Sequence, residues 1–349
     1  MQRRVALALA LSVAGIVAWM FHLVRAPSQG FQGAVFIDIP KGTSARTMAL
    51  LLEQQGVIES QWRFLATRAL RPRARLQAGE YRFDRPSSTW EVFDRIVRGD
   101  VFYYELVVPE GRNMFEIADS IEQLGLAAAS AFLAQARDPA LIRDIAPQAP
   151  TLEGYLYPDT YRFTRSNTPR EICETMTARF RKAWEESGSG TDIHRTVTLA
   201  SLVEKETAIP EERALVASVF TNRLRIGMKL DCDPTTIYSA ILDGRYRGAI
   251  HQSDLERKNP YNTYQYSGLP PGPIANPGLA SLQAALQPAE SEFLYFVAHP
   301  GNSGRHVFSS DIGAHQLAVA RYQSAHRKTE VKKATPKRSP ERAASRANH

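Results

Sequence analysis

Two glutamates near the middle of the chain, Glu204 and Glu206, have the spacing that best suits acid catalysis. The segment 194–207 (HRTVTLASLVEKET) predicts one helix, and residues two apart on a helix point about 200° from each other. Glu206 follows Leu199 and Leu202 on one face, whereas Glu204 follows smaller residues on the other. Apolar surroundings raise the pKa of a carboxyl, as general-acid catalysis at neutral pH requires. The spacing favours Glu206 as the acid; a solvated helix surface is the alternative for both.

The sequence lacks the motifs of other common enzyme classes. It contains no HExxH pair, no G-x-S-x-G elbow, and no glycine-rich Walker or Rossmann loop. Its histidines show no spacing typical of metal ligands. We therefore expect neither a metal ion nor a cofactor.

Further helices and loops must position the two acids. Apolar residues at helical spacing predict a helix over 169–187, and a second helix is predicted from Pro210, which suits a first helical position, to Gly227. The aromatic segment 151–163, interrupted by glycine and proline, predicts a loop with short extended pieces.

An internal repeat lies in the first half of the chain. Residues 35–58 and 104–127 share six identical positions at an offset of 69. Each copy predicts a strand, a Pro-x-Gly turn, a helix capped by Ser44 or Asn113, and a glycine that ends it. The pattern is similar to LysM-type modules, which bind N-acetylhexosamine polymers. A small α/β spacer without a ligand is the alternative.

The first segment predicts a membrane anchor. Residues 5–24 are almost uniformly apolar, and a helix of that length spans about 30 Å, the thickness of a bilayer core. Two arginines lie within residues 1–4, so this end is expected in the cytoplasm. A cleaved signal peptide is the alternative, but Arg25 and Pro27 suit its cleavage site poorly.

The composition predicts about two globular domains. Of 349 residues, 44% are apolar and 23% are charged, which excludes a collagen-like, wholly disordered or polytopic membrane protein. The only cysteines, Cys173 and Cys232, are too few for a zinc site of four thiolates. Outside the cytoplasm they could pair; two separate buried thiols are the alternative.

The net charge of +7 is concentrated at the ends of the chain. The stretch 327–349 holds eight Lys or Arg and two Glu, and is predicted to be a disordered basic tail. The middle of the chain is therefore nearly neutral, which argues against nucleic acid as a partner.

Seven segments together resemble the YceG-like family, the endolytic murein lytic transglycosylases. They are LEGYLYPDTY at 152–161, ASLVEKET at 200–207, VASVFTNRLRIGMKL at 216–230, DPTTIY at 233–238, YNTY at 261–264, GLPPGPIANPG at 268–278 and YFVA at 295–298. The resemblance extends from about residue 33 to residue 325. Before DPT the family commonly has Gln and a small hydroxyl residue, where this chain has Asp231 and Cys232, so no role is carried over to these two positions.

The resemblance implies an enzyme that cuts peptidoglycan strands between N-acetylmuramic acid and N-acetylglucosamine and so ends nascent strands. It carries the family's catalytic glutamate over to Glu206. One acid suffices, because the muramic C6 hydroxyl closes on C1 to form a 1,6-anhydro ring. Weaker candidates for sugar contacts are Glu153, Tyr238, Asn262, Tyr264 and Tyr266. The implied partners are peptidoglycan strands, the inner membrane and glycan polymerases such as penicillin-binding proteins.

The expected fold is α+β. It comprises a single-pass inner-membrane helix at 5–24, a linker at 25–32, a LysM-like region of βααβ-type units at 33–149, a mixed α/β catalytic domain in the periplasm at 150–326, and the tail at 327–349. Two other functions remain open. One is a non-catalytic, membrane-anchored peptidoglycan-binding scaffold, and the other is a hydrolytic muramidase, which product chemistry separates from the lyase.

Overall fold

The computed structural model describes residues 11, 12, 14, 15, 22, 24–28, 30–188, 192–301 and 304–334. The predicted anchor at 5–24 lies outside them except for six scattered positions, as does the tail from 335 onward. None of the helices in these ranges is long and apolar enough to cross a membrane.

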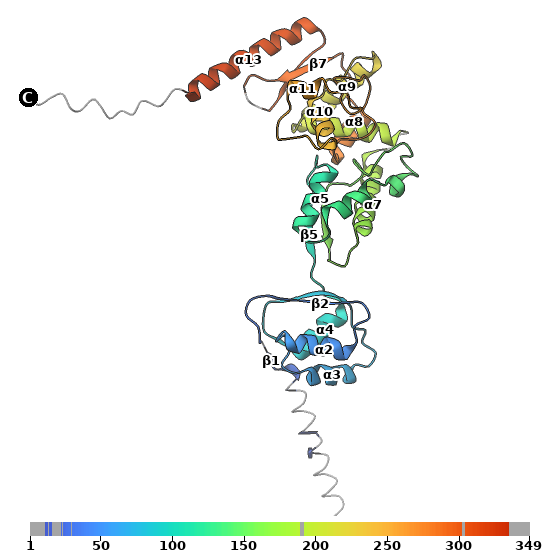
Figure 1. Cartoon of the computed structure of the whole chain (residues 1–349), viewed down its shortest axis with the longest axis vertical. Coiled ribbons are helices and arrows are strands. Elements are labelled where there is room, and N and C mark those ends of the chain that lie inside the picture. Colours follow the sequence, from blue (N-terminus) through green and yellow to red (C-terminus); the bar gives the residue numbers. More distant parts are fainter. Residues whose placement is uncertain are drawn as a thin grey trace, which may run out of the picture. The chain divides into compact units, whose positions relative to one another are not determined.

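The elements in chain order are β1 (Pro27–Ser28), β2 (Val35–Ile39), α2 (Ala45–Gln54), α3 (Gln61–Leu70), β3 (Gly79–Phe83), β4 (Ser87–Ser88), α4 (Thr89–Arg98), β5 (Tyr104–Val107), α5 (Met114–Gln123), α6 (Ala129–Ala136), the 3₁₀ turn η1 (Pro139–Ile142), β6 (Thr160–Phe163), α7 (Pro169–Ser187), α8 (Ile193–Glu206), η2 (Pro210–Glu212), α9 (Arg213–Arg225), α10 (Asp233–Leu242), α11 (Gln252–Leu255), α12 (Leu279–Leu286), β7 (Tyr295–Ala298), β8 (His306–Ser309) and α13 (Ile312–Ala334). Figure 1 labels most of them. The mixture of helices with short strands confirms the α+β class.

Contacts divide the chain into two compact units. Unit 1 holds the described residues up to Leu106 together with Gln123–Ala127 and Tyr161–Thr168, and unit 2 holds the rest. The predicted domains instead meet between 149 and 150. The difference arises because the turn and helix of the second repeat copy are bonded to later parts of the chain: the Gly111 N–H, for example, donates to the Asn276 carbonyl at 2.9 Å.

Unit 1 is built on the antiparallel pair β2–β3, whose register runs from Val35↔Phe83 to Ile39↔Gly79. Residues alternate along the strands, so that Ile37 and Tyr81 enter the core with side chains from α2, α3 and α4. A capping box formed by Ser88 and Glu91 begins α4, and Gly99 in the left-handed conformation ends it.

Both repeat copies fold as predicted into a strand, a turn and a helix. Ser44 caps α2 by accepting the Thr47 N–H, and Asn113 accepts the N–H of Glu116 at the start of α5. Gly56 and Gly125 follow the two helices at φ +69° and +66°, a conformation that glycine adopts without strain.

Unit 2 is mainly helical. The helix α8 packs against α12 and α9, and α12 packs against both α7 and α9. The sheet β7–β8 is an antiparallel hairpin that contacts α13. The core between α8, α9, α10 and α12 is formed by Leu202, Val216, Phe220 and their neighbours. This packing fixes the carboxyl-terminal end of α8, where the two glutamates lie.

Two boundaries differ from expectation. The helix predicted from Pro210 begins as the 3₁₀ turn η2 before α9 continues it, a common form of a first helical turn. The helix α13 runs to Ala334, past the predicted tail start at Arg327, because Lys, Glu, Arg and Ala are good helix formers. Of the two alternatives for the cysteines, the structure has separate buried thiols, since Cys173 and Cys232 are both free.

Candidate active site

Glu206 is the last residue of α8, and its carboxyl lines a cavity of about 440 Å³ in unit 2. The helix begins at Asp192, whose side chain accepts the Arg195 N–H. The apolar face predicted from the spacing is present, since Leu199, Leu202 and Val203 are buried. The other residues that line the cavity are Arg223, Leu230, Asp231, Asp233, Tyr264, Tyr295, Phe296, Ile312 and His315.

The Glu206 carboxyl sits in surroundings that favour its protonated form. Burial is the main cause that raises its pKa, and the nearby charge of Asp233 raises it further. The Cys232 thiol donates a hydrogen bond to Oε1 of Glu206 at 3.0 Å, which acts in the opposite direction and lowers the pKa. The group therefore holds its proton to higher pH than an ordinary glutamate.

Glu204 points to a different set of partners, as the two-residue spacing predicts. Its carboxylate accepts the Gly278 N–H at 3.0 Å and lies 3.7 Å from the Arg213 guanidinium. A backbone N–H and an arginine are polar partners, unlike the buried leucine and valine side chains that precede Glu206 on its face of the helix. The two glutamates thus have opposite chemical environments.

The loop 229–233 carries the cavity wall next to Glu206. Asp231 has a φ of +48°, a left-handed conformation that costs a residue with a side chain about 1–3 kcal/mol. Arg223 holds this loop in place because its Nη1 donates to the carbonyls of Lys229 and Leu230 at 3.2 and 2.9 Å. Strain held by surrounding bonds is characteristic of functional sites.

Aromatic side chains form the opposite part of the cavity. The Tyr264 hydroxyl donates to Asp233 at 2.6 Å, and Tyr295 lies under the Arg223 guanidinium at 5.2 Å from its ring centroid. Tyr295 also stacks on the His315 ring at 5.0 Å. Flat faces of this kind can pack against a pyranose ring, and Asp233 and Arg223 can bind its hydroxyl groups.

Glu153, a predicted site residue, lies in a separate buried network of unit 2. Its carboxylate accepts the Met114 N–H at 2.9 Å, the Asn276 amide at 2.9 Å and the Tyr238 hydroxyl at 3.0 Å. Burial raises the pKa of Glu153 to about 8. Glu153 and Tyr238 are 1% and 3% exposed, so in this structure they join four segments of the protein and do not face the cavity.

Two further predicted contacts also lie outside the cavity lining. Asn262 is fully buried, and its amide donates to the carbonyls of Asp254, Leu255 and Arg257. It therefore shapes the loop that carries Tyr264. Tyr266 is 47% exposed on the surface. Of the six predicted residues, the structure brings Glu206 and Tyr264 together.

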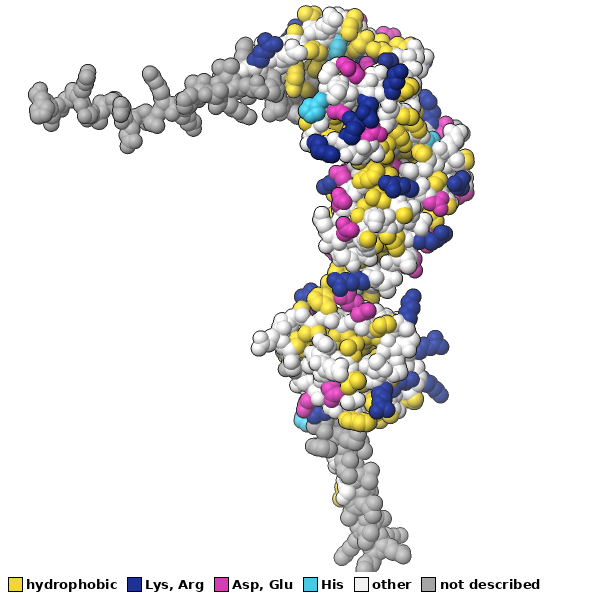
Figure 2. All heavy atoms as spheres, in the orientation of Figure 1, with side chains coloured by type: hydrophobic (Ala, Val, Ile, Leu, Met, Phe, Trp, Pro, Cys, Tyr) yellow, Lys and Arg dark blue, Asp and Glu magenta, His cyan; other side chains and the backbone are white. Residues whose placement is uncertain are grey.

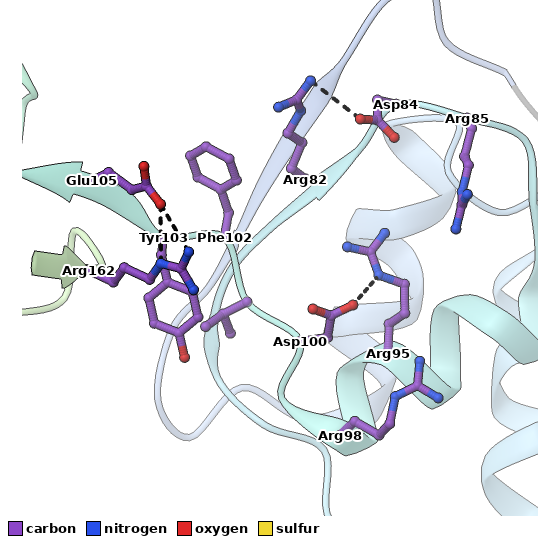
Figure 3. Close-up of a pocket in the computed structure, with 11 residues that line it drawn as sticks. Arg82, Asp84, Arg85, Arg95, Arg98, Asp100, Phe102, Tyr103, Glu105 and Arg162 are labelled. Atoms are coloured by element: carbon purple, nitrogen blue, oxygen red, sulfur yellow. Dashed lines mark hydrogen bonds and ion pairs between the residues drawn. The ribbon is translucent and has the colours of Figure 1, made fainter. Parts of the chain in front are cut away.

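A second hollow, of about 460 Å³, lies in unit 1 and is rich in arginine. Figure 3 shows its charged side chains largely paired: Arg82 with Asp84, Arg95 with Asp100, and Arg162 with Glu105. Each acid lies beside an arginine, so this pocket offers no carboxyl in apolar surroundings. Among the described residues, no group of three or more His, Cys, Asp or Glu side chains is placed to hold a metal ion.

The spacing argument missed several residues of the cavity. Asp233 and Tyr295 lie in the DPTTIY and YFVA segments, and those motifs were the available signal. His315 is in α13 and has no local pattern that marks it. Arg223 lines the cavity as well, and its Nε donates to the Leu294 carbonyl at 2.6 Å.

The chain is similar to proteins of known family. A model of the YceG-like family matches residues 37–321. The chain is 30% identical over 335 residues to an endolytic murein transglycosylase of Bacillus subtilis (strain 168), covering 90% of this chain and 92% of that protein. It is 27% identical to an endolytic murein transglycosylase of Streptococcus pneumoniae serotype 2 (strain D39), covering 82% of this chain but 58% of that longer protein.

A solved structure has a similar fold. The crystal structure of a putative YceG-like protein from Listeria monocytogenes superposes with a TM-score of 0.52 at 30% identity, covering 82% of this chain and 99% of that one.

Proposed function

The chain belongs to the YceG-like family, and from this membership and the cavity around Glu206 we infer that it is an endolytic peptidoglycan lytic transglycosylase. The enzyme is a lyase that breaks the glycosidic bond between N-acetylmuramic acid and N-acetylglucosamine within glycan strands. The observation that carries the proposal is the carboxyl of Glu206, whose pKa is raised by burial, at the edge of a cavity lined with aromatic and polar side chains.

The proposed reaction uses one protein acid. Glu206 donates its proton to the glycosidic oxygen as the bond to muramic C1 breaks, and the N-acetylglucosamine part leaves as an alcohol. The resulting carboxylate accepts the proton of the muramic C6 hydroxyl, whose oxygen bonds to C1 and forms the 1,6-anhydro ring. No water is consumed, and the nucleophile is already held in the substrate. Glu206 is protonated again at the end.

The neighbours of Glu206 have supporting roles in this proposal. Asp233 is positioned to favour positive charge that develops on the sugar ring, and its hydrogen bond from Tyr264 fixes its orientation. We assign the sugar contacts to Tyr264 and Tyr295, whereas Glu153, Tyr238 and Asn262 position the cavity walls.

We further propose that the chain is a single-pass inner-membrane protein. Residues 5–24 form the anchor, the N-terminus is cytoplasmic, and the catalytic part is periplasmic. This placement suits an enzyme that ends nascent strands beside glycan polymerases of the penicillin-binding class. The LysM-like character of residues 33–149 belongs to the same proposal, and the repeated strand–turn–helix pattern supports it.

The decisive test is the product of purified full-length protein on peptidoglycan, followed by mass spectrometry of released muropeptides. We expect anhydro-muramic ends from the wild type and a loss of about 10²–10⁴-fold in rate for Glu206→Gln. Glu204→Gln is the matched control, since its amide oxygen can still accept the Gly278 N–H, and its rate should stay within about tenfold of wild type.

Other outcomes identify the alternatives. Reducing ends in place of anhydro ends would mean that water is the nucleophile and the protein is a muramidase. The protein would be a binding scaffold if strands bind the wild type and Glu206→Gln equally but remain unaltered. Uncrosslinked nascent strands must be included in this test.

A further inference from the structure

The helix α3 and the loop after it form a strongly basic surface on unit 1. Residues 61–75 read QWRFLATRALRPRAR, with no acidic residue. The five arginines of this stretch are Arg63, Arg68, Arg71, Arg73 and Arg75. Figure 2 shows dark blue basic side chains projecting from unit 1, with yellow apolar side chains among them.

The same helix leaves apolar side chains in water. Trp62 is 67% exposed and Leu70 is 65% exposed. Phe64 and Thr67 enter the core from one face of α3. Trp62 and Ala69, seven residues apart, lie together on another face. A helix of a globular unit usually turns its polar face outward. Here the outward face carries a tryptophan and a leucine, and arginines flank it.

Acidic residues of unit 1 neutralise only part of this charge. Arg63 pairs with Glu59, and Arg71 with Asp94 at 3.0 Å. Within the described residues, Arg68, Arg73 and Arg75 have no carboxylate within 4.0 Å. Arg73 and Arg75 are exposed. Arg68 Nη1 also donates to the Arg71 carbonyl at 2.8 Å. The surface therefore offers an external anion the exposed guanidinium groups of Arg73 and Arg75 and the remaining N–H donors of Arg68.

This surface lies beside the point at which the chain enters unit 1. The strand β1 pairs with β4, with Pro27 opposite Ser88. The guanidinium groups of Arg25, just before β1, and Arg71, just after α3, lie 5.8 and 5.5 Å from the centre of the Trp90 ring. A chain that leaves a bilayer at residue 24 thus reaches a folded strand within three residues, next to the carboxyl-terminal end of α3.

We propose that α3 and residues 71–75 dock on the anionic phospholipid headgroups of the membrane that holds the anchor. Trp62 and Leu70 enter the headgroup region, and Arg68, Arg73 and Arg75 bind lipid phosphates. Lipid is the favoured occupant because an indole, an aliphatic side chain and several arginines on one short helix and the loop after it match the layered chemistry of a bilayer surface. The inference rests on the anchor in the proposed function and is independent of catalysis.

The test uses full-length protein reconstituted in vesicles, with an environment-sensitive fluorophore on a Trp62→Cys variant and brominated lipids as quenchers. Cys173 and Cys232 are buried, so labelling is directed to position 62. The matched control is a label at Asp38→Cys, on an exposed position of β2 in the same unit. The vesicles contain phosphatidylcholine alone or with phosphatidylglycerol.

We expect the label at 62 to be quenched in phosphatidylglycerol vesicles and the label at 38 to remain in water. Each arginine near an anionic leaflet strengthens adsorption about fivefold. Arg68→Glu, Arg73→Glu and Arg75→Glu together should therefore lower the docked-to-free ratio by at least about 100-fold. The corresponding triple lysine variant should retain docking.

Two outcomes would overturn the proposal. One is a label at 62 that stays in water on phosphatidylglycerol vesicles. The other is a label at 62 that leaves water equally in phosphatidylcholine vesicles and does so more as the protein density rises. That result would mean that α3 contacts a second copy of the chain. Neither outcome depends on turnover, so anhydro products from the same preparation would leave the proposed function intact.

Discussion

Glu206 and Glu204 are two residues apart, yet burial raises the pKa of Glu206, whereas Glu204 accepts a backbone N–H and lies beside an arginine. The difference comes from what each one touches: a buried thiol and an apolar helix face for Glu206, a backbone N–H and an arginine for Glu204. Cys232 is the neighbour that most directly adjusts the acid, because its thiol bonds to the carboxylate itself.

Replacing Cys232 should move the pH dependence of the reaction. The acid must carry its proton, so the rate falls as the pH rises through the pKa of Glu206. The thiol lowers that pKa by stabilising the carboxylate. Cys232→Ala removes the donor and should shift the alkaline limb of kcat/KM to higher pH, whereas Cys232→Ser keeps a donor and should leave the limb at or below its wild-type position.

The measurement is kcat/KM for anhydro-product release from pH 5 to 9. Cys232→Ala also leaves a small cavity, which costs about 1 kcal/mol of stability, but the position of the limb does not depend on how much enzyme is folded. Identical limbs in the alanine, serine and wild-type proteins would show that the thiol does not act on Glu206.

At the scale of elements, the turn after Glu153 ties the central loop to α8. Gly154 has a φ of +87°, and a Cβ built there would lie 2.5 Å from Pro273 and 2.9 Å from Val197 of α8. Gly125 has a similar φ of +66° but has no atom within 4 Å of such a Cβ. The two glycines therefore separate backbone strain from crowding.

Gly154→Ala should destabilise the protein far more than Gly125→Ala. Backbone strain alone costs about 1–2 kcal/mol, which we expect for Gly125→Ala. Crowding against Pro273 and α8 adds about 1–3 kcal/mol for Gly154→Ala. Thermal unfolding of the full chain in detergent measures both, and equal losses would mean that α8 yields to the added methyl group.

Local patterns predicted the elements well and their pairing less well. The helix containing Glu206 was predicted to within one residue, because apolar spacing and a following proline agree there. The burial of Asn262 and Glu153 could not be read from the sequence. Both owe their surroundings to residues far along the chain, such as Asn276 for Glu153. In the sequence, a polar residue in a loop motif gives the same pattern whether its side chain binds a ligand or is buried in the protein.

At the scale of the whole molecule, the proposed orientation across the membrane can be tested directly. Alkaline phosphatase, which is active only outside the cytoplasm, can be fused after Ala334 and expressed in a bacterial host. We expect high phosphatase activity from the full chain, because the arginines before residue 5 hold that end in the cytoplasm.

The control for this fusion lacks residues 1–26 and should have little phosphatase activity at the same expression level. An inactive full-length fusion would place the catalytic part in the cytoplasm, away from peptidoglycan. Equal activity from both fusions would mean that residues 5–24 are not the export signal.

The partly buried position of the Glu206 carboxyl has a consequence for the salt conditions in which the enzyme can work. Its pKa is raised chiefly because water is excluded, and only secondarily by the charge of Asp233. Mobile ions screen interactions between exposed charges but cannot enter a buried contact. Because burial is the larger cause, the pKa of Glu206 should change less with salt than the pKa of a carboxyl that is shifted by exposed charges. A cell envelope is a polyelectrolyte gel whose counter-ion content changes with the surrounding medium. An acid whose pKa is raised mainly by burial should respond little to that change.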